Sequence, residues 1–173
     1  MCLYFVVAVH TDRAAAEGDY RRLERLHWDT TLGVLDAVVL ARDGRGDLRF
    51  AIAPGDARAE LGCGLAGGLA MAVHPPMAFR WNPASEADRL AAAVVVDRIG
   101  AAVGRVDLKR YGLVLDSASV ALLAAAASER AAEVASALSP SWALASGYAP
   151  IDRAALAEGV RHAMDTAHLS APK

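Results

Sequence analysis

The residues best suited to chemistry near the start of the chain are His10 and Asp12, which follow the first apolar run. Imidazole nitrogens and carboxylate oxygens bind metals and carry protons, and His27 could complete a His/Asp metal site. However, His10 and His27 would lie at opposite ends of the helix expected at 12–28. We therefore predict no metal site, and we interpret Thr11 and Asp12 as the residues that begin that helix.

A nucleophilic thiol is the next candidate, with Cys63 as nucleophile and His74 as its base. Eleven residues separate them, which on a helix is about 16 Å at 1.5 Å per residue, too far for proton transfer. His74 could also titrate as a pH switch beside the prolines at 75–76, although a turn position explains it as well. Cys2 and Cys63 form neither a disulfide framework nor a metal motif, so we expect buried thiols in a reducing compartment.

A glycine motif at positions 62, 64 and 67 superficially resembles a phosphate-binding loop. A phosphate loop or dinucleotide fingerprint follows a strand directly, and a phosphate loop also contains a lysine. Neither condition is met here. We therefore predict no catalytic residue, no metal ligand, no cofactor and no cofactor-binding residue.

The most unusual stretch of the chain is uncharged from Leu61 to Phe79 and rich in glycine and alanine. Glycine costs about 1 kcal/mol in a helix interior, so close packing must offset it. Small residues four apart share one helix face, and such a flat face lets another helix approach closely. We predict a self-association surface of five small residues: Gly64, Gly68, Ala72, Gly100 and Gly104. The alternative is that the glycines pack against the chain's own helix at Gly100 and Gly104.

This stretch and the helix expected at 85–106 form a predicted helical hairpin that turns at His74 and the two prolines. The strongly apolar part, 61–73, is 13 residues long, whereas a spanning helix needs about 20. We therefore expect the hairpin to be buried in protein. A peripheral membrane contact, or a span made by the whole hairpin, stays open. The chain is predicted to be one domain, 1–173, with the hairpin as an insertion at 57–106.

Charge and the amino terminus limit the partners and the compartment. The formal net charge is −2, which argues against nucleic acid because a nucleic-acid partner needs a basic face. No basic segment precedes the first apolar run, so the start does not resemble a signal peptide. We expect a cytoplasmic protein without a nucleic-acid partner.

Hydrophobic periodicity and turn residues predict the elements. The expected strands are 3–9, 34–41, 48–53, 118–127 and 142–148. The expected helices are 12–28, 60–73, 85–106, 107–115, 129–138 and 150–164, followed by a frayed polar tail at 165–173. The alanine-rich segment 118–127 could also be a helix. The fold class is α+β: a ferredoxin-like sheet containing βαβ units, with an inserted glycine/alanine-rich helical hairpin. Right-handed crossovers would place helices 12–28 and 129–138 on one face.

The order of these motifs resembles a known family. An Ala-Val-Val-x-x-Arg-Asp-x-x-Gly hairpin spans 37–46, a glycine-rich block ends in Pro-Pro, and Asp-Leu-Lys-x-x-Gly-x-x-Leu-x-x-x-Ser spans 107–119. The pattern, over about 3–140, resembles a bacterial glycine-zipper family of unknown function. Its members are often described as membrane-associated or general-stress proteins. Asp116-Ser117-Ala118 replaces the Pro-Gly usual there. The resemblance implies the fold and the apolar hairpin, and no catalytic residue.

Three functions compete. The first is a non-enzymatic, self-associating protein, a stress-related scaffold or assembly subunit that forms a homo-oligomer through the hairpin. The second is a small-ligand-binding or sensor module with a pocket between the sheet and the hairpin. The third is an enzyme, which a pocket containing His10, Asp12 or His27 would favour. The sequence favours the first, because it contains the small-residue surface and lacks a catalytic constellation.

Overall fold

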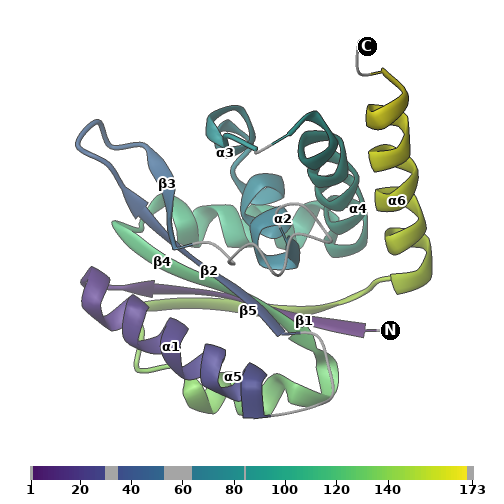
Figure 1. Cartoon of the computed structure of the whole chain (residues 1–173). Helices are drawn as coiled ribbons and strands as arrows, with labels where there is room; N and C mark the ends of the chain where they lie inside the picture. The colour runs from purple at the N-terminus through teal and green to yellow at the C-terminus, as the bar shows by residue number, and fades with distance from the viewer. Residues whose placement is uncertain (1, 30–34, 53–63, 84, 171–173) are drawn as a thin grey trace.

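The computed structural model describes residues 2–29, 35–52, 64–83 and 85–170 (Figure 1). Within them, one antiparallel sheet has the strand order β3-β2-β4-β1-β5. Its strands are β1 (Cys2–His10), β2 (Leu35–Arg42), β3 (Leu48–Ile52), β4 (Val120–Ala127) and β5 (Ala143–Pro150). The helices are α1 (Arg13–Asp29), α2 (Gly64–Val73), α3 (Pro76–Arg80), α4 (Glu86–Asp116), α5 (Ala131–Ala137) and α6 (Arg153–Ser170), with a 3-10 turn at Ser128–Arg130. The predicted α+β class is confirmed.

Two apolar cores lie on the two faces of this sheet. Figure 1 shows α1 and α5 on one face and α2, α3, α4 and α6 on the other. Successive side chains of a strand point to opposite faces. In β1, accordingly, Phe5 and Val7 belong to the core under α2 and α4, whereas Tyr4 and Val6 belong to the core under α1. The predicted placement of both crossover helices on one face is confirmed.

The alanine-rich strand β4 lies between β1 and β2 and is buried along its whole length. The prediction that segment 118–127 forms a strand is confirmed for Val120–Ala127. Alanine is a poor strand former, but its small side chain suits a central strand with a helix on each face. Both α1 and α2 pack against β4.

The long helix α4 contains the predicted helix 85–106 and the predicted separate helix 107–115. Ser85 begins it as expected, since its Oγ accepts a hydrogen bond from the backbone N of Asp88 at 3.1 Å. The boundary between the two parts lies at Gly104, whose φ of 78° and ψ of 158° are not helical. A positive φ costs glycine little, so the helix axis bends there and the chain then continues as helix to Asp116.

Two other boundaries differ from the prediction. Helix α2 ends at Val73, before the two prolines, as predicted, but Pro76 then begins a further short helix, α3, because proline is compatible with the first turn of a helix. The last helix continues through most of the expected tail, to Ser170. Its start is fixed by Asp152, whose Oδ1 accepts hydrogen bonds from the backbone N of Ala154 and Ala155. The expectation of a buried thiol is wrong for Cys2, which is exposed at the start of β1. Cys63, the first part of the insertion (57–63) and the last three residues lie outside the described residues.

The helices of the described segments are either short or interrupted by charged residues. Among them, none is both long enough and apolar enough to cross a membrane.

Candidate functional site

The predicted association line on α2 faces the protein's own interior. Gly64 and Gly68 are buried. A Cβ atom on Gly68 would lie 2.6 Å from Cγ1 of Val95 and 2.9 Å from Cδ1 of Ile99, both on α4. The expectation that Gly64 and Gly68 look outward is therefore wrong. Gly68 instead makes room for two bulky side chains of the same chain.

The other residues of the predicted surface do not complete a face with these two. Ala72, Gly100 and Gly104 are half-buried. A Cβ atom on Gly100 or Gly104 would meet no neighbouring atom within 4 Å, so neither glycine makes the close helix contact that the alternative prediction required. Gly104 is instead needed for its positive φ. A part for these residues in self-association stays a prediction.

Gly64 has a separate structural reason. Asp36 of β2 is buried, and its Oδ2 accepts a hydrogen bond from the backbone N of Ala66 at 2.9 Å. The first N–H groups of a helix lack intrahelical partners, so a carboxylate stabilises them. A Cβ atom on Gly64 would collide with the Asp36 carboxylate. Asp36 therefore anchors the start of α2 to the sheet.

A buried polar cluster joins β1, α1 and the segment before β5. Asp19 of α1 is 0% exposed, and His10 at the end of β1 is 3% exposed. Asp19 accepts hydrogen bonds from the backbone N and the Oγ of Ser139, at 3.0 and 2.8 Å. Arg22 forms an ion pair with the same carboxylate. His10 Nε2 lies 3.4 Å from Oδ2 of Asp19 and makes no hydrogen bond with any described residue.

The chemistry of this cluster is structural. Burial lowers the pKa of His10, and Asp12 opposes this shift while Arg22 adds to it, so the fold favours the neutral imidazole. A nucleophilic triad places the base between the nucleophile and the carboxylate. Here Ser139 and His10 both face Asp19, which solvent does not reach. Asp19 therefore clamps α1 to the segment before β5, and His10 at the end of β1 lies beside this clamp.

The metal site considered at His10 and His27 is not assembled by the described residues. The side chain of His27 lies outside them. Within the described part of the chain, no group of three or more His, Cys, Asp or Glu side chains could hold a metal ion.

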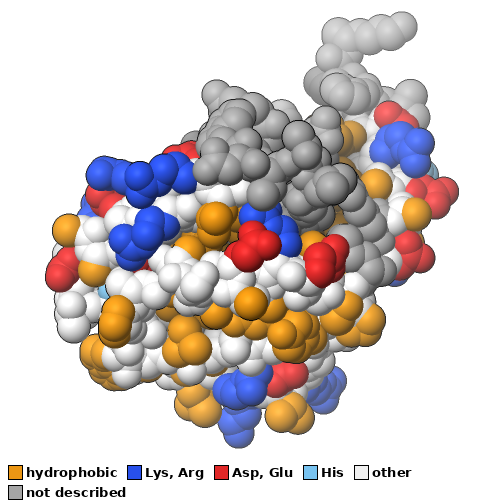
Figure 2. Space-filling view, turned by 90° about the horizontal axis from the view of Figure 1, so that it is seen from below, with side chains coloured by type: hydrophobic (Ala, Val, Ile, Leu, Met, Phe, Trp, Pro, Cys, Tyr) orange, Lys and Arg blue, Asp and Glu red, His pale blue; other side chains and the backbone are white. Residues whose placement is uncertain are grey.

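The edge strand β5 exposes large apolar side chains on the sheet face of α1 and α5. Trp142, Leu144 and Tyr148, which we call the β5 strip, are 60%, 53% and 59% exposed. The face follows from the register, because Tyr148 pairs with Tyr4 of β1 and the two rings lie 5.2 Å apart. Figure 2, which views the molecule from this side, shows hydrophobic side chains gathered across its lower half.

On the opposite face of the sheet, side chains of α4 contact the main chain of β5. Nη2 of Arg110 donates a hydrogen bond to the carbonyl of Ser146 at 2.6 Å. A Cβ atom on Gly147 would lie 2.8 Å from Oη of the buried Tyr111 and 3.0 Å from Nη2 of Arg110. Glycine at 147 therefore admits both side chains, and a donor already occupies the carbonyl at the middle of this edge.

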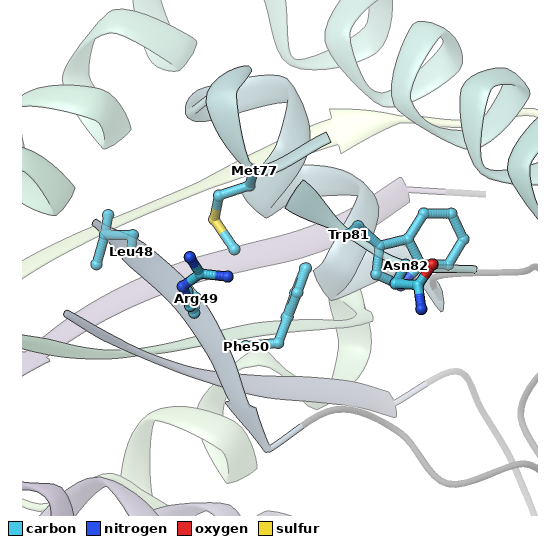
Figure 3. Close-up of a pocket in the computed structure, with 6 residues that line it drawn as sticks. All are labelled: Leu48, Arg49, Phe50, Met77, Trp81 and Asn82. Carbon is cyan, nitrogen blue, oxygen red and sulfur yellow. The ribbon is translucent and has the colours of Figure 1, made fainter. Parts of the chain in front are cut away.

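A small pocket lies between the opposite edge strand, β3, and the short helix α3 (Figure 3). Its volume is about 190 Å³. Figure 3 shows Met77 pointing down from α3 and Phe50 pointing up from β3 toward the space between them, with Trp81 and Asn82 together at one end. Its lining is Leu48, Arg49, Phe50, Met77, Trp81 and Asn82.

Sequence reasoning missed most of these features. Asp19 could have been found, because it lies three residues after Ala16 and four before Leu23, within the apolar arc of helix 12–28. A carboxylate in such an arc indicates a buried partner. The exposure of the β5 strip and the lining of the pocket depend on contacts between distant segments and leave no local signal.

No family model, no curated protein and no solved structure matches this chain. The resemblance to the glycine-zipper family stays a prediction from the sequence pattern.

Proposed function

We propose that this protein acts by self-association, as a scaffold or assembly subunit of a homo-oligomer, and that the β5 strip forms the contact between copies. The observation that carries the proposal is the strip itself: two large apolar side chains exposed on an edge strand, with a third, Trp142, just before the strand begins. An exposed apolar patch of this kind marks an interaction site more often than a scattered apolar residue does.

The charge pattern favours a second copy as the partner. No charged residue occurs from Leu138 to Ile151, although natural edge strands commonly carry charges that prevent association. A strip whose own side chains carry no charge offers a foreign protein little to select by electrostatics, and the nearest described cation, Arg110, is bonded to the Ser146 carbonyl. It can meet its own copy about a twofold axis, apolar side chain against apolar side chain, without repulsion.

The contact is made by side chains and not by joining two sheets. Because Arg110 already donates to the Ser146 carbonyl, main-chain pairing of two β5 strands would first have to displace the guanidinium. Packing of the β5 strip against the same strip leaves this bond intact. Stable interfaces bury about 800 Å² on each partner, more than three side chains provide, so we expect a weak dimer with a Kd on the order of 10 µM.

The strand order supports a ferredoxin-like core as part of this proposal. Without β3, the order is β2-β4-β1-β5. In this order β4 lies between the two strands joined by α1, and β1 lies between the two joined by α5. This is the split βαβ arrangement of a ferredoxin-like sheet, with β3 as an added edge strand and α2 to α4 as the insertion.

Sedimentation velocity across the micromolar range tests the proposal. We expect Leu144→Glu and Tyr148→Glu each to weaken association at least about 30-fold, since central apolar contacts contribute about 2 kcal/mol or more. Leu113→Glu is the matched control, because Leu113 on α4 is 64% exposed and lies outside the strip. A wild-type protein that stays monomeric at hundreds of micromolar would overturn the proposal. Equal weakening by Leu113→Glu would move the interface away from β5.

A further inference from the structure

We propose that the pocket between β3 and α3 binds a small, uncharged aromatic compound that carries one hydrogen-bonding group, of the aromatic carboxamide class. This binding site is independent of the proposed self-association, because it lies at the opposite edge of the sheet from β5.

The floor of the pocket sets the size and polarity of the ligand. Leu48 and Met77 are 1% and 2% exposed and close the inner end of the pocket. Its volume is about 190 Å³. An apolar cavity of about 150 Å³ accommodates benzene, so this space fits one aromatic ring with a small substituent. The inner end offers the ring only apolar surface.

The walls favour an aromatic ring over an aliphatic one. Phe50 and Trp81 are half-buried and pack against the main core, which holds their rings in place. Aromatic rings gain about 0.5–1.5 kcal/mol from edge-to-face or offset contacts beyond the burial of area. The Met77 thioether, which Figure 3 shows entering the same space, adds a sulfur–aromatic contact.

The rim selects an uncharged ligand. Nε of Arg49 bonds to Oδ2 of Asp43 at 2.5 Å, and Asp43 also accepts hydrogen bonds from the backbone N of Arg45 and Asp47. These bonds lower the pKa of Asp43 to about 2, so its charge balances that of Arg49 at neutral pH. A carboxylate ligand would gain little net attraction there, because it would compete with Asp43 for the guanidinium.

A carboxamide matches the groups that remain at the rim. Among the described residues Arg49 is bonded to Asp43 through Nε, so other N–H donors of its charge-balanced guanidinium face the rim and can bond to the carbonyl of a neutral amide. Asn82 is exposed at the end of the pocket beside Trp81, and its side chain both donates and accepts. A primary amide can pair with the Asn82 carboxamide through one donor and one acceptor, while its ring lies on the apolar floor.

The ε-methyl group of Met77 is a direct probe of occupancy. We would titrate the full-length protein with benzamide and follow the methionine methyl signals by NMR, assigning Met77 from the signal lost in Met77→Leu. We expect a saturable shift of the Met77 methyl with a Kd on the order of 1 mM, as befits so small a ligand. The absence of a saturable shift would overturn the proposal.

Two matched ligands test the chemical class. Benzoate has the shape of benzamide with a negative charge, and cyclohexanecarboxamide has the same amide without the aromatic ring. We expect each to bind at least about fivefold more weakly, in line with the modest energy of one such contact. Binding of benzoate as tight as that of benzamide would overturn the uncharged class. Equally tight binding of cyclohexanecarboxamide would overturn the aromatic class.

One variant pair tests the rim without disturbing the fold. Asn82→Ala removes an exposed side chain, and we expect it to weaken benzamide binding about three- to tenfold through loss of hydrogen bonding. Ser136→Ala is the control, an exposed polar deletion on α5, across the sheet. Unchanged affinity in Asn82→Ala would contradict the assigned amide contact.

Benzamide should bind the monomeric Leu144→Glu variant with the same affinity as the wild type. A failure of the ligand proposal can therefore be distinguished from a failure of the self-association proposal.

Discussion

Helix α2 and strand β5 are both free of charged side chains, yet the protein uses them differently. In α2, every residue from Gly64 to Met71 is buried, and bulky side chains of α4 fill the space left by Gly68. In β5, Leu144 and Tyr148 project beyond the cover of α1 and α5 and are more than half exposed. Helix α2, whose small-residue pattern suggests an interface, is therefore part of the core.

The difference shows what the absence of charge can indicate. A segment without charged residues is expected to be covered by other protein surface. The absence of charge does not indicate whether that surface belongs to the same chain or to another one. On α2 the same chain supplies the cover through α4 and the sheet. On the outer side of β5 no such cover is present among the described residues, so self-association becomes the reasonable source of one.

Substitution of Gly68 should have the largest effect, because it tests directly whether α2 belongs to the core while β5 belongs to the surface. Gly68→Leu would force a side chain into Val95 and Ile99, and overpacking of a core typically costs about 1–3 kcal/mol. We expect the free energy of unfolding, measured in urea, to fall by about this amount while the dimer Kd of the folded protein stays unchanged. Gly100→Ala is the control: it meets no neighbour and should stabilise the helix by up to about 1 kcal/mol.

The outcome separates a core role from an interface role. If Gly68→Leu leaves stability intact and lowers the mass of the folded protein in sedimentation, then α2 is an interface and the contrast with β5 is lost.

Much of the fold was predictable, because it is encoded locally. The apolar run of β1, the capping residue Ser85 and the uncharged length of β4 each specify an element within a few residues. The bend at Gly104 was not predicted as the boundary between helices, since an isolated glycine is tolerated in many helices. Gly104 differs from a glycine inside a regular helix only by the positive φ that it adopts in the fold.

The candidate surfaces were less predictable, for a geometric reason. Strands lie about 4.8 Å apart, so five of them make a sheet about 20 Å wide, which two helices of about 10–12 Å cover only where both helices run along its full length. On the α1 side, α5 is only seven residues long, and β5 at the edge keeps its outward side chains exposed. Whether Leu144 is buried is thus decided by the length and position of α5. The pattern of β5 itself does not contain that information.

Loss of the clamp at Asp19 should affect β5 more than α2, because the clamp holds the segment before β5 and does not touch α2. Asp19→Asn keeps the shape but removes the charge and one acceptor facing Ser139 and Arg22. Hydrogen bonds to a charged group contribute about 1.5–3 kcal/mol each, so we expect a loss of about 2 kcal/mol in stability. Hydrogen exchange should quicken more at 139–150 than in α2, and equal quickening would contradict a local clamp. Asp97→Asn, on the exposed side of α4, is the control.

The smallest effect we predict is the pH dependence of this same clamp. Burial lowers the pKa of His10 in the folded protein below the usual 6.5, so between the folded and the unfolded pKa the unfolded chain binds more protons. Stability therefore rises with pH in that window. The contribution of His10 to the free energy of unfolding should be fully present above pH 6.5 and decline as the pH falls, by at most about 1.4 kcal/mol per pH unit for one group.

His10→Gln should flatten the decline seen in urea unfolding between about pH 7 and pH 5, a range centred near the histidine pKa. His162→Gln, on the exposed side of α6, should not. If both variants keep the wild-type decline, His10 is not its source. If the decline is confined to β5 in hydrogen exchange, the clamp acts on the edge strand and leaves the buried α2 unaffected.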